Sequence, residues 1–167
     1  MLYQKLNLNP ISDSGPDMDI EIVRLIAGKQ YAEAYQMLNN QTNPTTSNLY
    51  NLSICMYIGE AYEACILQLD KAYEKLKPYM NYAIQGDEIS QAIQSKQRGF
   101  NTFLNPVTDY YVSRFPCTLK NNILRLKIEC LRKLEMWDEI VKTSHQLTHK
   151  NYKNVEEALA EIELCVV

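Results

Sequence analysis

The 167-residue sequence has few of the residues that interrupt regular structure, with 5 glycines and 6 prolines. This scarcity argues against an all-β fold rich in tight turns and against low-complexity disorder. No run approaches the roughly 18 consecutive apolar residues of a membrane span. The first ten residues lack the apolar core of a signal peptide. We therefore expect a cytoplasmic chain that folds around one hydrophobic core.

The sequence also lacks a cysteine framework and a strong charge of either sign. The five cysteines form no Cys-x-x-Cys pair and their number is odd, which favours reduced thiols over disulfides. The formal charge of −3 gives the chain as a whole no electrostatic attraction to nucleic acid or acidic membrane. We expect neither nucleic acid nor membrane as a partner.

Apolar residues recur with helical spacing along most of the chain, and the pattern predicts no strand. The pattern predicts an irregular leader at residues 1–16 and then seven or eight helices. One of these covers about residues 46–58, and the helix after it ends at Pro78. Residues 79–117 are less regular and include a thinly apolar helix after Gly86. A last helix is expected at about 154–165.

One short motif recurs at the junctions between consecutive expected helices. Segments 28–34 and 59–65 both read Gly-x-x-Tyr-x-x-small, and segment 134–140 repeats the spacing with Trp137 as the aromatic residue. A small residue lets the chain turn between antiparallel helices, and the aromatic ring one turn later wedges between them. The motif therefore predicts repeated helix pairs.

This motif resembles the tetratricopeptide repeat (TPR), in divergent form, because the glycine falls one position early in two copies and is missing from the third. The resemblance implies an all-α fold, a right-handed α-solenoid of about three TPR-like helix pairs, within a single domain at 17–167. The pairs cover about 17–44, 46–78 and 118–148, with an irregular insertion at 79–117 and a C-terminal capping helix. A generic helical bundle is the alternative fold.

The resemblance also implies a function, because TPR proteins grip peptides on their concave side. An apolar, tyrosine-bearing centre with a basic end would suit an extended segment or helix that carries acidic groups. The 12 tyrosines support this view, since tyrosine is suited to interfaces. The candidate groove residues are Tyr50, Ile54, Tyr57, Asn122, Arg125, Glu129, Arg132 and Lys133. We therefore expect a non-enzymatic protein–protein interaction module that binds a partner polypeptide.

One TPR ligand is not expected. Family members that bind chaperone C-termini hold the terminal carboxylate with a clamp of lysine, asparagine and arginine side chains. Among the matching positions of this sequence, only Asn51 has the required residue type. The clamp is therefore incomplete.

Enzymatic readings have weak support. His145 and His149 lie at i, i+4 on an expected helix, but Gln146 stands where a zinc protease has its glutamate. Cys117 follows Pro116 at a helix start, and no histidine can be assigned as its base. No phosphate-binding loop or nucleophile elbow occurs. We expect no catalytic residue, no cofactor and no metal.

Two further binding roles are open. Leu164, Val166 and Val167 give the last helix an apolar end, which would suit a homo-oligomer or a structural subunit, since solenoid ends need a polar face. The length and the three TPR-like repeats also resemble class II type III secretion chaperones, although no residue motif supports that reading.

Overall fold

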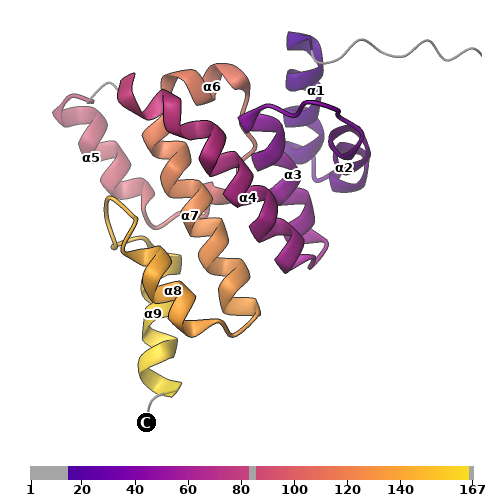
Figure 1. The fold of residues 1–167 in the computed structure, drawn as a ribbon. Coiled ribbons are helices and arrows are strands. Elements are labelled where there is room, and N and C mark those ends of the chain that lie inside the picture. The colour runs from indigo at the N-terminus through magenta and orange to yellow at the C-terminus, as the bar shows by residue number, and fades with distance from the viewer. Residues whose placement is uncertain (1–14, 83–85, 166–167) are drawn as a thin grey trace, which may run out of the picture.

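The computed structural model describes residues 15–82 and 86–165, and all regular structure within these ranges is helical. This confirms the all-α class (Figure 1). Residues 1–14 of the expected leader lie outside the described residues, and Pro16 already opens the first helix. In the described part of the chain no helix is both long and apolar enough to cross a membrane.

Nine α-helices and two short 3₁₀ helices make up these ranges. The α-helices are α1 (Pro16–Ala27), α2 (Tyr31–Asn39), α3 (Thr46–Ile58), α4 (Tyr62–Leu76), α5 (Glu88–Gln97), α6 (Asp109–Arg114), α7 (Pro116–Lys133), α8 (Trp137–Ser144) and α9 (Lys153–Cys165). The 3₁₀ helices are η1 (Lys77–Tyr82) and η2 (Thr102–Leu104). The count exceeds the expected seven or eight because α6 is a separate short helix.

Consecutive helices pack against one another in each helix pair, and α4 also packs against α7, which follows it after α5 and α6. Helix α3 packs against α2 and α4, α4 against α7, and α7 against α8 and α9. Figure 1 shows this progression from indigo α1 to yellow α9, with α5 and α6 in the connection between α4 and α7. The core forms two clusters, and Ile66 and Tyr73 of α4 pack against both of them.

Helix α3 is buried on nearly all sides, which its composition explains. It begins with a cap in which the Thr45 hydroxyl accepts a hydrogen bond from the Asn48 N–H. Its apolar residues are spread around the helix rather than confined to one stripe, so it has no face suited to solvent. Its buried polar side chains therefore need partners inside the protein, and Ser53, for example, donates to the carbonyl of Leu49.

Three turns share one backbone geometry: those between α1 and α2, between α3 and α4, and between α7 and α8. The central residues have positive φ: Lys29 at 61°, Glu60 at 59° and Glu135 at 55°. In each turn the next N–H donates back to a carbonyl five residues earlier, as from Ala61 to Met56 at 2.9 Å. Gly59 has an ordinary φ of −80° and Leu134 one of −92°. The left-handed residue thus follows the glycine position, which is why leucine is tolerated there.

Because a side chain in the left-handed region costs about 1–2 kcal/mol, Glu60→Gly should stabilise the protein. Glycine loses about 0.5–1 kcal/mol more entropy on folding, so the expected net gain is about 0.5–1 kcal/mol. Urea unfolding would measure it. The matched control is Glu63→Gly, which removes the same charge but places glycine at an exposed position in the first turn of α4 and should destabilise by a similar amount. Equal effects of the two variants would contradict the prediction.

Candidate functional site

Residues 100–109, which we call the inner segment, lie against α3 and α7 and are held mainly through their main chain. The Tyr50 hydroxyl donates to the carbonyl of Phe103 at 2.6 Å. The Asn51 amide makes two bonds to Val107, donating to its carbonyl at 2.8 Å and accepting from its N–H at 2.9 Å. Both side chains come from α3, and all four of these residues are buried.

Arg125 of α7 holds the beginning of the inner segment. Its side chain is 1% exposed. One Nη donates to the carbonyl of Phe100 at 2.7 Å and the other to the Thr102 hydroxyl at 3.0 Å. Its Nε donates to Oδ1 of Asn154, on α9, at 2.9 Å. One arginine therefore ties α7, α9 and the inner segment together.

The positive charge of Arg125 has no direct carboxylate partner among the described residues. All three of its hydrogen-bond acceptors are neutral, and its guanidinium lies 4.5 Å from the ring centroid of Tyr152 and 4.9 Å from that of Phe103. Burial lowers the pKa of Arg125, and the negative charge of Glu129 opposes that fall. The nearest compensation is indirect, because Asn154 also donates to Glu129 at 3.0 Å.

Glu129 is itself a buried carboxylate on α7. Burial raises its pKa, while the hydrogen bond from Asn154 and the charge of Arg132 oppose that rise. Its Oε2 lies 3.7 Å from the Arg132 guanidinium, which also pairs with Glu161 of α9. Glu129 thus belongs to the contact between α7 and α9.

The candidate groove residues divide by accessibility. Five are buried beneath the inner segment and α9 or within the helix packing: Tyr50, Ile54, Asn122, Arg125 and Glu129. Three are accessible at the C-terminal ends of α3 and α7: Tyr57 and Arg132 are half-buried and Lys133 is exposed. The structure brings Tyr57 close enough to Glu129 and Arg132 for their charges to affect its pKa, which burial raises to about 12.

Sequence reasoning missed Thr102, Asn154 and the inner segment itself. Asn51 was considered only as part of an incomplete carboxylate clamp, yet its amide faces a peptide bond of the same chain. A usable signal existed in α3, where Ser47, Asn48 and Asn51 interrupt a helix with no polar face. Such residues indicate buried hydrogen bonds to another segment.

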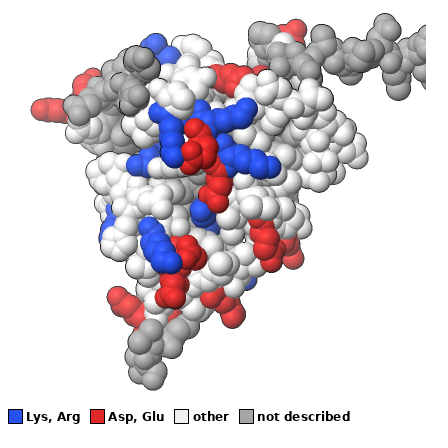
Figure 2. Space-filling model, in the orientation of Figure 1, with Lys and Arg blue, Asp and Glu red and all other residues white. Residues whose placement is uncertain are grey.

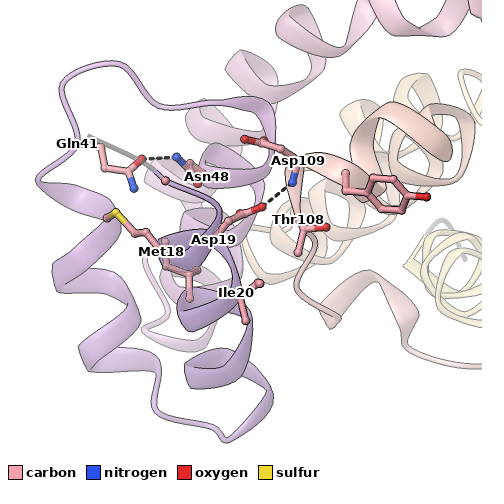
Figure 3. Close-up of a pocket in the computed structure, with 10 residues that line it drawn as sticks. Met18, Asp19, Ile20, Gln41, Asn48, Thr108 and Asp109 are labelled. Atoms are coloured by element: carbon pink, nitrogen blue, oxygen red, sulfur yellow. Dashed lines mark hydrogen bonds between the residues drawn. The ribbon is translucent and has the colours of Figure 1, made fainter. Parts of the chain in front are cut away.

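An acidic cleft of about 450 Å³ lies between the starts of α1, α3 and α6 (Figure 3). Oδ2 of Asp19 accepts from the Asp109 N–H at 2.7 Å, and the Ser47 hydroxyl donates to Asp109 Oδ1 at 2.7 Å. Figure 3 shows Asp19 pointing toward Asp109, and Gln41 paired with Asn48. Burial raises the pKa of Asp19, and the charge of Asp109 adds to that rise.

Asp19→Asn should therefore stabilise the protein at neutral pH. A raised pKa means that the folded state favours the protonated form, so full stability is present below the unfolded pKa of 3.8 and is lost as pH rises through the folded pKa. The expected gain at pH 7 is a few tenths of a kcal/mol to about 1 kcal/mol, and it should vanish near pH 3. Thermal unfolding from pH 3 to pH 7 would measure the difference. Asp17→Asn, on the same first turn, is the control, and a gain independent of pH would contradict the assignment.

A basic cleft of about 640 Å³ lies between α5, the start of α7 and the residues after α8. Its lining includes four residues that carry or can carry positive charge and no Asp or Glu: Arg98, Arg114, Arg125 and His149. Arg98 donates to Oδ1 of Asn151 at 3.0 Å. Cys117 also lines this cleft, and it is exposed, unlike the buried Cys55, Cys65 and Cys130.

The expected pairing of His145 and His149 on one helix face is wrong. Helix α8 ends at Ser144, so His145 caps it and His149 lies beyond it. The Ser144 hydroxyl donates to the Val141 carbonyl, and such bonds compete with continuation of a helix. Within the described ranges no group of three or more potential metal ligands occurs.

The most visible charged surface lies elsewhere. Figure 2 shows basic side chains gathered over the middle of the face on which α4 lies, with acidic side chains among them. Lys77 pairs with Glu74 and Lys127 with Asp70, both at 2.7 Å. Such exposed pairs contribute little energy and neutralise much of the charge locally, so this surface differs from the unbalanced lining of the basic cleft.

No protein-family model matches the chain, and comparisons with curated proteins and with solved structures give no significant match. Function must therefore be inferred from the chain's own residues.

Proposed function

We propose that this chain is a non-enzymatic, TPR-like helical repeat module that binds a partner polypeptide. One observation carries the proposal: α3 holds the main chain of a polypeptide segment through Tyr50 and Asn51. The shared geometry of the three turns and the sequential packing of the helix pairs support the repeat reading. The segment held here belongs to the same chain.

Main-chain hydrogen bonds are a general means of holding an extended polypeptide, because nearly every residue offers the same peptide N–H and C=O groups whatever its side chain. Pockets for the side chains then determine which residues are preferred. In the inner segment, the side chains of Phe103 and Val107 are buried in this way. The face of α3 that holds the inner segment supplies both the hydrogen bonds to a main chain and the pockets for side chains. These are the contacts that binding of a separate polypeptide requires. The part of that face left uncovered is where an external partner would extend the contact.

We place the partner at the uncovered end of this face, which we call the open end: Tyr57, Ile58, Tyr62, Arg132 and Lys133. The rings of Tyr57 and Tyr62 lie 5.8 Å apart, and Ile58 is 43% exposed. Aromatic and arginine side chains beside an apolar residue are the composition that interfaces favour. The open end contains three of the eight candidate groove residues.

The double variant Tyr57→Ser/Lys133→Glu tests the open end. In quantitative affinity purification from the native host, the unchanged protein should enrich a partner at least about tenfold more than the double variant does. This ratio corresponds to a loss of about 1.4 kcal/mol in binding free energy. The control Tyr35→Ser/Lys71→Glu makes the same changes at exposed positions on α2 and α4 and should retain the partner. Equal enrichment by both variants and the unchanged protein would refute the open end.

Self-association is a second candidate, favoured by Leu164, which is 78% exposed near the end of α9. Val166 and Val167, also expected to contribute, lie outside the described residues. Leu164→Asp should convert a dimer into a monomer in sedimentation experiments. If the unchanged protein sediments as a monomer at all concentrations, self-association is excluded.

A further inference from the structure

The basic cleft has an unusual floor, because Arg125 is a buried cation whose direct contacts are all neutral. Buried charges are costly unless an opposite charge compensates them. The side chains of Asn154, Thr102, Phe103 and Tyr152 and the carbonyl of Phe100 satisfy its hydrogen bonds or cover its faces, and none of these groups carries a negative charge. The one carboxylate whose charge favours charged Arg125 is Glu129, which shares Asn154 with it and does not line the cleft.

The rest of the lining increases this imbalance. Arg98, Arg114 and His149 line the same cleft, and no Asp or Glu does, although acidic residues outnumber basic ones in the chain, 20 to 17. The side chains of Arg114 and His149 make no hydrogen bond or ion pair with any described residue. Positive charges gathered in a concave site with low-dielectric walls raise the local concentration of anions.

We propose that the basic cleft binds an oxyanion, a carboxylate or a phosphate, which offsets the excess positive charge of its lining. Arg98 and Arg114 would contact it directly, since guanidinium groups match the geometry of both anions. Gln91, Gln94 and Gln97 of α5 add neutral amide donors to the same lining. The cleft volume of about 640 Å³ is that of ordinary ligand sites.

This site is separate from the open end and does not depend on the proposed function. A carboxylate would come from acidic side chains of a polypeptide, and a phosphate from a phosphorylated small molecule or from free phosphate. The two sources share one recognition chemistry, so the probes below are chosen to separate them.

Cys117 provides a reporter, because it is exposed in the cleft while three other cysteines are buried. We would measure the rate of Cys117 alkylation in the full chain by peptide mapping, which also separates it from Cys165. The probes are inorganic phosphate and a hexaglutamate peptide, each compared with sodium chloride at equal ionic strength. At least one probe should slow alkylation saturably, by about fivefold or more.

The variant Arg98→Gln/Arg114→Gln should weaken the probe's Kd at least about tenfold. Arg24→Gln/Lys71→Gln removes the same charge at exposed positions on α1 and α4 and should leave the Kd unchanged. Protection by the peptide alone assigns carboxylates, and protection by phosphate alone assigns a phosphoryl ligand; both support the site. No protection, protection matched by sodium chloride, or equal loss in both variants would overturn it. Each of these failures would leave the open end untouched.

Discussion

Replacing Arg125 with alanine should lower the free energy of unfolding by about 3–5 kcal/mol. The substitution removes three hydrogen bonds from a charged donor and leaves the carbonyl of Phe100 without its partner. It also opens a cavity between the rings of Phe103 and Tyr152.

Urea denaturation would measure this loss, and two further variants interpret it. Arg125→Met keeps much of the side-chain volume without the charge, so it should cost less than alanine if the uncompensated charge is itself unfavourable. Arg24→Ala removes an exposed arginine paired with Glu21 and should change stability by less than about 0.5 kcal/mol. A loss below about 1 kcal/mol for Arg125→Ala would show that the network does not hold the inner segment.

Asn51→Ala should have the next largest effect, a loss of about 2–4 kcal/mol. The alanine side chain leaves both the N–H and the carbonyl of Val107 buried and unpaired, because Asn51 is their partner at 2.9 and 2.8 Å. Unpaired buried peptide groups are expensive, since they have also lost their hydrogen bonds to water. The damage should begin at the inner segment rather than spread evenly through the molecule.

Hydrogen exchange distinguishes this local effect from general destabilisation. The Val107 amide should lose more protection than amides in α8, which packs on the other core cluster. Asn40→Ala, which removes an exposed bond to the carbonyl of Gln36, is the matched control and should leave Val107 protected. Uniform loss of protection across α8 and the inner segment would contradict a local role for Asn51.

Helix bounds and turns could be predicted from the sequence, but the contacts by which distant segments bury those helices could not. The bounds of α3 were expected at 46–58 and are confirmed, because Thr45 and Gly59 mark its ends. The three helix junctions were also located, because an aromatic residue follows each turn. These features depend on residues within one or two helical turns of each other.

The candidate site depends on contacts between distant residues, which periodicity does not encode. Tyr50 and Phe103 are 53 residues apart in the sequence, and Asn51 and Val107 are 56 apart. A helical pattern shows which face of its own helix Tyr50 or Arg125 lies on. It contains no information on whether that face contacts solvent or another segment. Their burial could therefore not be read from spacing alone.

The inner segment has a consequence for the kinetics of folding. The α3–α4 and α7–α8 pairs consist of contacts close in sequence, which form rapidly once helices nucleate. Docking the inner segment requires closure of a loop of more than fifty residues, whose entropy must be lost before Tyr50 and Asn51 gain their partners. The helix pairs should therefore assemble early, and the docking of residues 100–109, which completes the core cluster around α3, should be a late step.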